Sequence, residues 1–362
     1  MRVLVVNAGS SSLKLRVLDG VTLAVTHDLP AGANGFDRDD LSAFLGDVRV
    51  DAIGHRVVHG GTRFTKPTRL DRDVVEALEA LIDLAPLHQP KSLAGIDAVG
   101  AALADVPAVA CFDTAFHASM PEAAYTYALP HEWRSRWAVR RYGFHGLSHS
   151  YGSRRAAELV KRPLLDLRVV VCHLGAGASL CAVAGGRSVD TTMGFTPLEG
   201  LVMATRSGSV DPGLVLWLQE HAGLSEHDVA EALEHRSGLL ALGGSSDMRE
   251  LLERARRGDD RAALAIDVYV HRLAAGVAAM AASLGGVDVL AFTGGVGENA
   301  PEIRARASER LQFLGVEIGH GNDGAHGDTD ISASGAAVRT VVVAAREDLE
   351  ILRGVESVLS PG

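Results

Sequence analysis

The sequence predicts an α/β protein built from two similar halves, and three observations lead to this prediction. Strand-like and helix-like segments alternate along nearly the whole chain, which is typical of α/β proteins. The length of 362 residues corresponds to two domains of ordinary size. A degenerate repeat divides the chain, because the segment that starts at Val3 resembles the segment that starts at Val169. Each copy is an apolar strand, a turn of small residues and a second strand, so duplication of one unit accounts for the length.

The predicted strands are short apolar runs rich in β-branched residues. The second one also alternates, with Leu13, Leu15 and Val17 separated by Lys14 and Arg16, which is the period of a strand. The predicted strands cover residues 2–6, 13–18, 51–59, 108–112, 169–172, 179–183, 287–292 and 339–343.

The predicted helices carry apolar residues at helical spacing and have recognisable ends. Asp71 is placed to cap the first of them. Pro301 stands in the first turn of another, where its missing N–H costs nothing. The predicted helices cover residues 71–84, 246–257, 261–284, 301–314 and 347–358. Residues 319–328 are polar and rich in glycine, so we expect a surface loop there.

Composition and charge exclude several classes of protein. A net charge of −10 argues against a general nucleic-acid-binding protein. The three cysteines show no C-x-x-C spacing, which argues against a disulfide framework and a zinc ribbon. The amino terminus has no signal-peptide pattern, and the richest apolar run, residues 273–284, is too short to span a bilayer. We therefore expect a cytoplasmic protein with neither a membrane nor a nucleic-acid partner.

Three turns of small residues directly follow predicted strands, at residues 7–12, 173–179 and 293–299. Such turns can present backbone N–H groups to a phosphate, although any one of them also fits a simple tight hairpin. The chain lacks G-x-x-x-x-G-K-[ST], G-x-G-x-x-G and the protein-kinase motifs. The first two turns lie between strands and resemble the phosphate clamp of the actin-like ATPase domains, in which hairpins from two duplicated halves hold the nucleotide. The third precedes a helix, as the adenosine-binding turn of that superfamily does.

Further motifs resemble the acetate kinase family, in collinear order over essentially the whole chain. They are VNAGSSSLK (6–14), IGHRVVHGG (53–61), LAPLH (84–88), FDTAFH (112–117), RYGFHG (141–146), HLG (173–175), MGFTPLEG (193–200), TRSG (205–208), DMR (247–249), GVGEN (295–299) and Glu347.

The resemblance implies two duplicated actin-like (ribonuclease H-like) domains with the site in the cleft between them. Residues 1–146 and about 347–362 would form the domain on the acyl-substrate side, and residues 147–346 the domain on the nucleotide side. The implied activity is reversible, direct in-line transfer of the ATP γ-phosphoryl group to acetate, with Mg²⁺, or Mn²⁺ in its place. The family also implies a homodimer.

By resemblance, the catalytic residues are Asp113, His145 and Arg206. Arg206 would stabilise the charge of the transition state, as an arginine finger does in other phosphoryl-transfer enzymes, and His145 would donate a hydrogen bond to the transferring group. Asp113 would act as a base or as an organiser of metal-bound water and arginines. The second role is preferred, because a free carboxylate substrate is already ionised at neutral pH.

The resemblance also assigns the substrate and nucleotide residues. Arg56 would hold the substrate carboxylate in a bidentate fork, with a structural salt bridge as the alternative. The other acyl-site residues are His88, Val58, Leu87, Phe144 and Pro197. The ATP-binding residues are Ser10, Ser12, Lys14, His173, Leu174, Gly175, Ala176, Gly177, Asp247, Met248, Arg249, Gly295, Val296, Gly297, Glu298 and Asn299. The metal ligands would be Asn7 and Glu347, although Glu347 also suits the amino end of a helix.

Several positions depart from the family pattern, among them Ala204, Ser209 and Val210 beside the arginine loop. Ala176 stands where the family usually has asparagine, which removes an amide donor near the nucleotide, and Gln89 replaces the usual asparagine after His88. No charged catalytic position is lost.

Other functions remain open at this stage. The pocket residues suit acetate, but one methylene changes affinity by only ~1–3 kcal/mol, so a propionate or butyrate kinase is the nearest alternative. A non-catalytic, actin-like ATP-binding switch is an alternative of another class. The pairs His55/His59 and His145/His149 have the i, i+4 spacing of zinc ligands, but the first pair lies in a predicted strand.

Overall fold

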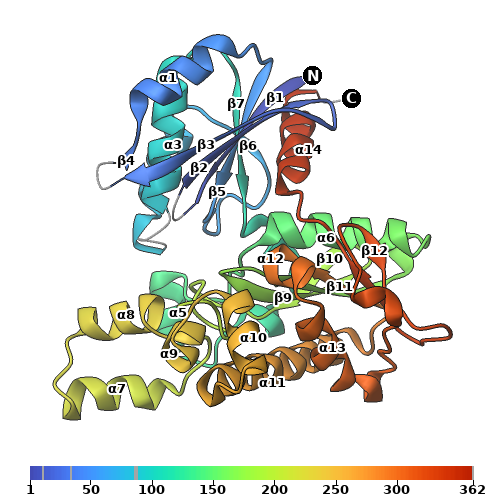
Figure 1. Cartoon of the computed structure of the whole chain (residues 1–362). Helices are drawn as coiled ribbons and strands as arrows, with labels where there is room; N and C mark the ends of the chain where they lie inside the picture. Colours follow the sequence, from blue (N-terminus) through green and yellow to red (C-terminus); the bar gives the residue numbers. More distant parts are fainter. Residues whose placement is uncertain (10–11, 33–34, 85–88, 361–362) are drawn as a thin grey trace. The chain divides into compact units, whose positions relative to one another are not determined.

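The computed structural model describes residues 1–9, 12–32, 35–84 and 89–360. The chain forms two compact units, which interleave along the sequence (Figure 1). Unit 1 consists of Met1–Ala118, Phe144–Tyr151 and Arg346–Gly362, and unit 2 consists of Ser119–Gly143 and Gly152–Ala345. The predicted assignment of an acyl-side and a nucleotide-side domain is a statement about function and stays a prediction here.

Unit 1 is built on a sheet with the order β4-β3-β2-β1-β5-β7-β6. The strands β1, β5 and β7 are parallel neighbours, and β2 and β3 extend the sheet as antiparallel strands. The strands are β1 (Arg2–Ala8), β2 (Ser12–Asp19), β3 (Thr22–Gly32), β4 (Gly35–Phe36), β5 (Ala52–Val57), β6 (Thr68–Arg69) and β7 (Ala108–Phe112). The helices are α1 (Arg38–Asp47), α2 (Arg72–Glu79), α3 (Gln89–Ala102), α14 (Glu347–Leu359) and the 3₁₀ helices η1 (Ile82–Leu84) and η2 (Ala115–Ser119).

Unit 2 repeats this strand layout in the order β10-β9-β8-β11-β13-β12. Its parallel neighbours β8, β11 and β13 correspond to β1, β5 and β7, and the hairpin β8–β9 corresponds to β1–β2. The strands are β8 (Arg168–Leu174), β9 (Ala178–Ala184), β10 (Arg187–Thr191), β11 (Val289–Thr293), β12 (Thr329–Asp330) and β13 (Arg339–Val342). The predicted duplication of one α/β unit is therefore confirmed.

Helices surround the second sheet. They are α4 (Glu122–Tyr125), α5 (His131–Trp137), α7 (Pro212–His221), α8 (Glu226–His235), α9 (Gly238–Gly243), α10 (Met248–Arg256), α11 (Asp260–Leu284), α12 (Gly294–Asn299), α13 (Pro301–Glu309), and the 3₁₀ helices η3 (Leu164–Asp166), η4 (Gln312–Leu314) and η5 (His320–Asn322). Helix α6 (Gly146–Leu159) begins in unit 1 and ends in unit 2.

Helix α11 is long and apolar enough to cross a membrane by length and composition. Charged residues interrupt the first half of the helix, so its uninterrupted apolar stretch is shorter than the helix itself. Its buried side chains include Ile266, Val270 and Leu273. It packs against α9, α10, α13 and β9. The core of unit 2 therefore accounts for its apolar composition.

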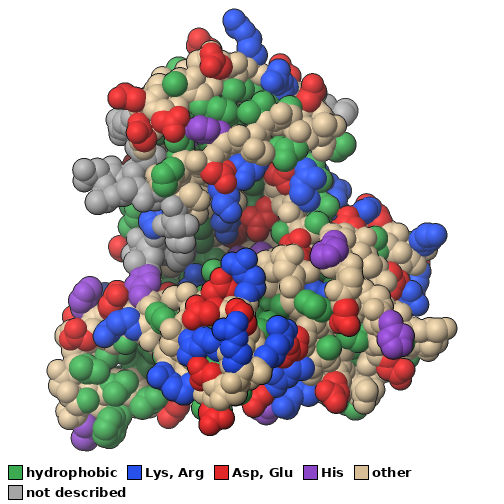
Figure 2. All heavy atoms as spheres, viewed as in Figure 1, with side chains coloured by type: hydrophobic (Ala, Val, Ile, Leu, Met, Phe, Trp, Pro, Cys, Tyr) green, Lys and Arg blue, Asp and Glu red, His purple; other side chains and the backbone are tan. Residues whose placement is uncertain are grey.

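Charged side chains of both signs gather over α10 on the face shown in Figure 2. Arg254 pairs with Asp259 at 2.7 Å, and Arg256 pairs with Glu302 at the same distance. Ion pairs at the surface contribute little to the free energy of folding, because solvent screens them. Their main effect is to neutralise the arginines of this helix locally.

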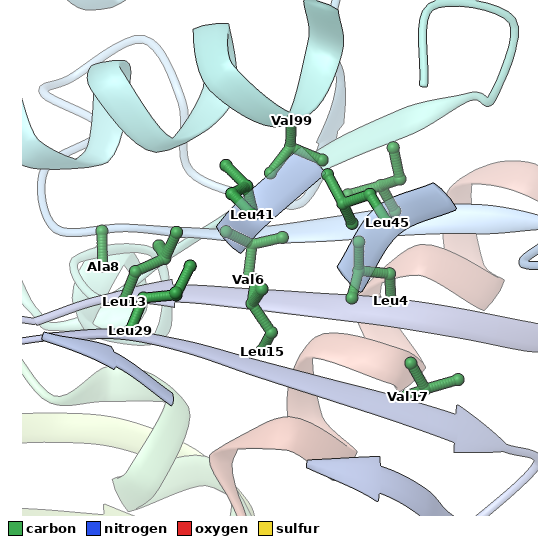
Figure 3. Close-up of a cluster of buried hydrophobic side chains, with 11 residues drawn as sticks. Leu4, Val6, Ala8, Leu13, Leu15, Val17, Leu29, Leu41, Leu45 and Val99 are labelled. Atoms are coloured by element: carbon green, nitrogen blue, oxygen red, sulfur yellow. The ribbon is translucent and has the colours of Figure 1, made fainter. Parts of the chain in front are cut away.

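The two faces of the unit 1 sheet are covered by different helices (Figure 1). Alternate residues of β1 point to opposite faces. Leu4 and Val6 pack with Leu41 of α1 and Val99 of α3 (Figure 3), whereas Val3 and Val5 pack with α14. Because both faces of β1 are buried against helices, the strand is a continuous apolar run in the sequence.

Most predicted elements lie within two or three residues of their observed bounds. The strand at 108–112 has the predicted bounds, and Asp71 caps α2 through a hydrogen bond from the Val74 backbone N–H at 2.8 Å. The predicted helix 71–84 is wrong in its second half, because α2 ends at Glu79 and a separate 3₁₀ turn follows. Likewise, the predicted helix 301–314 divides into α13 and η4.

Gln89 is a structural residue in this fold. It is fully buried, and its side-chain amide accepts a hydrogen bond from the His59 backbone N–H and donates to the His59 and Leu78 carbonyl oxygens. The departure from the family pattern at this position therefore ties α3 to the segment that follows β5.

Two buried histidines should make the fold sensitive to acid. Burial lowers the pKa of His55 to about 3 and that of His59 to about 4. Because an unfolded histidine has a pKa near 6.5, the unfolded chain binds protons that the folded chain excludes below that pH. Their contribution to stability is complete above about pH 6.5, and we expect the urea midpoint to fall as the pH is lowered from there towards 4.

The matched variant is His55→Leu, which removes one of the two titrations. We expect the slope of unfolding free energy against pH, measured by urea titrations between pH 6.5 and 4.5, to fall by about one proton equivalent at most. An unchanged slope would show that His55 binds protons equally in the folded and the unfolded chain.

Candidate functional site

The carboxyl ends of three parallel strands bring polar side chains together in unit 1. Asn7 lies in β1, Arg56 in β5, and Asp113 directly after β7. Val6 pairs with His55 and Arg56 with Cys111, so the three strands end at the same edge of the sheet. This edge is where open α/β sheets bind ligands.

The centre of this cluster is an ion pair between Arg56 and Asp113. The Arg56 Nη2 lies 2.6 Å from Asp113 Oδ2, and Arg56 Nε donates to both carboxylate oxygens at 3.1 and 3.2 Å. Only 2 % of the Asp113 side chain is exposed. Burial alone would lower the pKa of Arg56, but Asp113 and Glu347 outweigh burial and raise it above its usual value. Arg56 is therefore a fixed positive charge.

Asn7 and Glu347 complete the cluster. Arg56 Nη1 donates to Asn7 Oδ1 at 3.0 Å, and Asn7 Nδ2 donates to Glu347 Oε2 at 3.4 Å. Glu347 is the first residue of α14, and its carboxylate lies 3.9 Å from Arg56 Nε. The two predicted metal ligands are thus neighbours, although they come from opposite ends of the sequence.

The guanidinium group of Arg56 keeps part of its donor capacity. An arginine has five N–H groups. The contacts to Asp113 and Asn7 use one N–H group on each of the three nitrogen atoms Nε, Nη1 and Nη2. Each of the two Nη atoms carries a second N–H group, which has no acceptor within residues 1–9, 12–32, 35–84 and 89–360. These groups are available to a carboxylate ligand.

His145 has an unusual backbone conformation. Its φ is +57°, in the left-handed region that non-glycine residues rarely adopt. The following residue explains how the chain is held: the Gly146 N–H donates to the Asp113 carbonyl oxygen at 2.9 Å, and a Cβ at Gly146 would lie 2.1 Å from that oxygen. Strained backbone of this kind clusters at functional sites. Here the strained residue precedes the Gly146–Asp113 hydrogen bond, which connects the two predicted catalytic segments.

Several other predicted residues also belong to unit 1. Val58 and Phe144 are buried, as apolar pocket walls would be. Lys14 is exposed and lies opposite Asn7 in the β1–β2 register, while Ser12 is the first residue of β2. The predicted residues Ser10, Leu87 and His88 lie outside the described residues.

Unit 2 contains a cavity of about 490 Å³ that is lined by half of the predicted nucleotide residues. Its predicted wall residues come from the turn after β8, the start of α10, and α12. They are Gly175, Ala176, Asp247, Met248, Arg249, Gly295, Val296 and Asn299. The residues His173, Leu174, Gly177, Gly297 and Glu298, also predicted to bind ATP, lie beside these segments and do not line the cavity.

The cavity has walls that sequence reasoning missed. They are Ala204, Leu239, Ser246, Leu252, Tyr269 and Ala300. Most are small or apolar residues, and no motif distinguishes them from ordinary core positions. Tyr269 is buried, and its hydroxyl has no hydrogen-bond partner in the described part of the chain.

The third predicted turn is a short helix, so the prediction of a turn at 293–299 is corrected. Thr293 ends β11, and α12 begins at Gly294, whose φ of +79° requires glycine. A Cβ there would lie 2.9 Å from the Leu174 carbonyl oxygen. The close approach of two backbones, rather than a free turn, is what the glycines provide.

A buried arginine that carries no motif holds α12 in place. Arg304 is fully buried and donates to the carbonyl oxygens of Gly297 and Glu298 at 2.9 and 2.8 Å. It also donates to the side chain and carbonyl oxygen of Asn322, both at 2.8 Å. These contacts satisfy carbonyl groups at the carboxyl end of the helix, which lack partners within the helix itself.

The start of α10 is fixed by an aspartate. Asp247 caps the helix by accepting a hydrogen bond from the Arg249 backbone N–H at 2.8 Å. The side chain of Arg249 donates to the same carboxylate and, as the larger cause, lowers the pKa of Asp247 to about 2. Arg249 is 85 % exposed, so this cation stands at the mouth of the cavity.

Arg206 lies in the loop between β10 and α7. Its Nη1 donates to the Pro197 carbonyl oxygen at 3.0 Å, and its Nε lies 3.5 Å from Glu234 Oε2. Burial lowers the pKa of Arg206, and Glu234 partly opposes that effect. At 19 % exposure the guanidinium is held but still accessible.

A network of three side chains holds the loop that carries Pro197. Glu199 accepts hydrogen bonds from Tyr127 at 2.5 Å and from Arg141 at 2.6 Å. Arg141 also donates to the carbonyl oxygens of Thr192 and Met193. The network therefore positions the carbonyl group that contacts Arg206.

Among the described residues, no group of three or more histidine, cysteine, aspartate or glutamate side chains is arranged to hold a metal ion. The spaced histidine pairs are accordingly not part of such a group: His55 and His59 are buried around β5, and the His145 and His149 rings lie 6.5 Å apart in a tilted arrangement.

Comparisons with known proteins agree with the motifs. A model of the acetokinase family matches residues 36–353. The chain is 45 % identical to an acetate kinase of Gloeobacter violaceus, over 98 % of each chain. It superposes on the crystal structure of Porphyromonas gingivalis acetate kinase with a TM-score of 0.92 and 36 % identity, and on a propionate kinase from Francisella tularensis with a TM-score of 0.92 and 37 % identity. Each match covers 99 % of this chain and all of the other.

These structures also confirm the predicted fold, a pair of duplicated actin-like α/β domains. The two sheets with equivalent strand orders, the collinear motifs and the near-complete coverage lead to one conclusion: the chain belongs to the acetokinase family.

Proposed function

We propose that this protein is an ATP-dependent acetate kinase that catalyses ATP + acetate ⇌ acetyl phosphate + ADP. The observation that carries the proposal is the cluster of Arg56, Asp113, Asn7 and Glu347 at the ends of three parallel strands. The family relationship and the cavity lined by the predicted nucleotide residues support it. We propose a cytoplasmic location, with ATP and acetate as substrates and without a membrane or nucleic-acid partner.

The reaction needs alignment and positive charge more than proton transfer. A carboxylate oxygen of acetate forms a bond to the γ-phosphorus, and the bond from that phosphorus to the β–γ bridging oxygen breaks, in line. Acetate is ionised at neutral pH, so no base is required. We assign binding of the acetate carboxylate to the remaining N–H groups of Arg56, stabilisation of the transferring group to Arg206, and a hydrogen bond to that group to His145.

In this mechanism Asp113 is the organiser of the site. Its carboxylate is engaged by the Nε and Nη2 atoms of Arg56, which fixes the plane of the guanidinium and directs the remaining N–H groups. The geometry therefore supports the organising role over the base.

Asn7 and Glu347 have the chemistry of a Mg²⁺ site. Mg²⁺ prefers oxygen ligands, with one or two carboxylates and several waters or phosphates. Glu347 supplies one carboxylate whose contacts to Asn7 and Arg56 are long, at 3.4 and 3.9 Å, and Asn7 supplies an amide. When bound, Mg²⁺, or Mn²⁺ in its place, would neutralise phosphate charge.

The acyl substrate is proposed to be acetate, with propionate as the second candidate. The match to a propionate kinase structure at a TM-score of 0.92 keeps the second candidate open. We expect kcat/KM to fall from acetate to propionate to butyrate, each methylene costing ~1–3 kcal/mol in a pocket sized for acetate. The measurement is acyl-phosphate formation from ATP and Mg²⁺, with the product trapped by hydroxylamine.

Two other outcomes of this experiment would change the proposal. A maximum at propionate or butyrate would replace acetate as the substrate and leave the family chemistry intact. No acyl phosphate from any short carboxylate, with folded protein that still binds ATP, would favour the non-catalytic switch.

The protein is also proposed to form a homodimer, through α7. None of the residues of α7 is buried, and Leu214, Leu216 and Trp217 are about half exposed. Figure 2 shows apolar side chains gathered over this helix. Apolar patches of this kind usually mark interfaces. We expect the mass measured by light scattering to be that of a dimer, and Leu216→Glu to shift it towards the monomer.

Leu165→Glu is the matched control for this variant. Leu165 is 82 % exposed, belongs to the same unit and lies in η3. The proposal requires that the control stay dimeric. A wild-type monomer, or a Leu216→Glu variant that remains a dimer, would exclude α7 as the interface.

A further inference from the structure

A second cavity, of about 260 Å³, lies in unit 1 and does not include the residues of the candidate site. Its apolar walls are Pro67, Cys111, Phe112, Phe116 and Leu147. Its polar lining is Thr65, Lys66, Ser150, Glu350, Arg353 and Ser357. The cavity thus combines an apolar interior with a charged rim, which is the usual composition of a small-molecule site.

The charges at the rim favour an anion. Lys66 and Arg353 are exposed, and neither side chain has an ion-pair partner within residues 1–9, 12–32, 35–84 and 89–360. Glu350, the acidic group of the lining, accepts a hydrogen bond from the Ser150 hydroxyl at 2.7 Å. Two cations against one hydrogen-bonded carboxylate leave a net charge of about +1, which suits a monoanion.

The depth of the cavity is set by a close helix contact. Gly354 of α14 forms part of the lining, and a Cβ at this position would lie 2.6 Å from Cys111 Sγ and 3.1 Å from Pro67 Cγ. A larger residue would push α14 away from β7. The glycine keeps the helix close, so the cavity is small and limits its ligand to a compact apolar group.

The back wall of this cavity is the chain that carries two predicted catalytic residues. Phe112 immediately precedes Asp113, and Gly146 immediately follows His145. The Gly146 N–H donates to the Asp113 carbonyl oxygen at 2.9 Å, and a Cβ at Gly146 would lie 2.9 Å from Phe116 Cβ. A molecule packed against Phe112, Phe116 and Gly146 would therefore press directly on the backbone that fixes Asp113 and His145.

We propose that this cavity is an effector site for a small organic monoanion with a compact apolar body, such as an aromatic carboxylate. The apolar body packs against Phe112, Phe116 and Leu147, and the carboxylate faces Lys66 and Arg353. An occupied site changes turnover by shifting the segments that position Asp113 and His145. The binding part stands on the cavity alone, and the effect on turnover rests on the proposed function.

The binding experiment uses 4-fluorobenzoate as the probe with the full-length protein. Titrations are followed by ¹⁹F NMR in the presence of saturating acetate and MgADP, so that acyl and nucleotide sites are filled. We expect saturable binding, and weaker binding of the neutral analogue 4-fluorobenzamide. Absence of saturable binding, or displacement of the probe as acetate is raised, would overturn the proposal.

Variants locate the probe. The double variant Lys66→Gln with Arg353→Gln is expected to weaken binding by about tenfold or more, because it removes both charged donors that would hydrogen-bond the carboxylate. Ser357→Trp, which fills the rim, should also abolish binding. Arg69→Gln is the control, since this exposed arginine lies in β6 outside the lining. Thermal unfolding verifies that each variant is folded, and unchanged affinity in the double variant would contradict the assignment.

The kinetic arm tests regulation separately. At saturating 4-fluorobenzoate, we expect a change in kcat that persists at saturating acetate and disappears in the double variant. Binding without any change in kcat would remove the regulatory role. If the protein proves inactive with every short carboxylate, the proposed function fails, whereas the NMR titration still decides whether the cavity binds the anion.

Discussion

Replacing Arg206 with alanine is expected to lower kcat by ~10³- to 10⁵-fold, the range observed for transition-state arginines in phosphoryl transfer. The guanidinium is positioned by the Pro197 carbonyl oxygen and by Glu234 at 3.5 Å. These contacts hold a cation at the surface of unit 2 without neutralising it fully. Trapping acyl phosphate with hydroxylamine measures the loss, and calorimetric titration with MgADP measures nucleotide affinity, which should change little.

The control is Arg236→Ala, which removes an exposed arginine of the same unit. It should leave kcat close to that of the wild type. If Arg206→Ala keeps most of its activity, or loses activity only because it no longer binds nucleotide, Arg206 does not act on the transferring group.

Asp113→Asn is expected to have two large effects, one on turnover and one on stability. The substitution leaves the Arg56 guanidinium largely buried without a charged partner at 2.6 Å. Breaking a buried pair from one side costs about 3–5 kcal/mol. A misplaced Arg56 should lower kcat by on the order of 10²-fold or more, because small errors in position are costly in catalysis. Urea unfolding and the trapped-product assay measure the two effects.

If Asp113 organises the site, the Asp113→Asn variant should also bind Mg²⁺ more weakly. Because Arg56 also contacts Asn7 at 3.0 Å and Glu347 at 3.9 Å, the apparent affinity for Mg²⁺ should weaken in Asp113→Asn. Unchanged Mg²⁺ dependence would exclude the role. Asp105→Asn, which alters an exposed aspartate of unit 1, is the control and should behave like the wild type in all three measurements.

Most of the strands that were predicted from the sequence are buried on both faces, whereas β2 was predicted from the alternation of buried and exposed residues. The runs in β1, β7, β8 and β11 are continuously apolar because helices cover both sides of each sheet. Strand β3 was not predicted, since most of its described residues are exposed or half exposed and its pattern is mixed. Burial on one side only leaves a weaker record in the sequence.

The residues of the candidate site could be proposed from motifs in the sequence, whereas their contacts could not. Arg56 and Asp113 both stand in motifs, but their pairing depends on the adjacency of β5 and β7, and 57 positions separate them in the chain. Composition and spacing do not report strand order. Similarly, Leu239 and Tyr269 look like ordinary core residues of helices, and only the folded chain shows that they line the same cavity as Ala176.

Arg304 and Asn322 show how a site can depend on positions that no ligand would touch. The arginine is fully buried, and its three donor nitrogens are committed to α12 and to Asn322. A lysine has one compact ammonium group and cannot span these acceptors. Among related sequences the two positions should therefore change together or not at all, whereas exposed arginines such as Arg256 should be substituted independently of other positions. A covarying pair here would mark residues that support the unit 2 cavity rather than residues that line it.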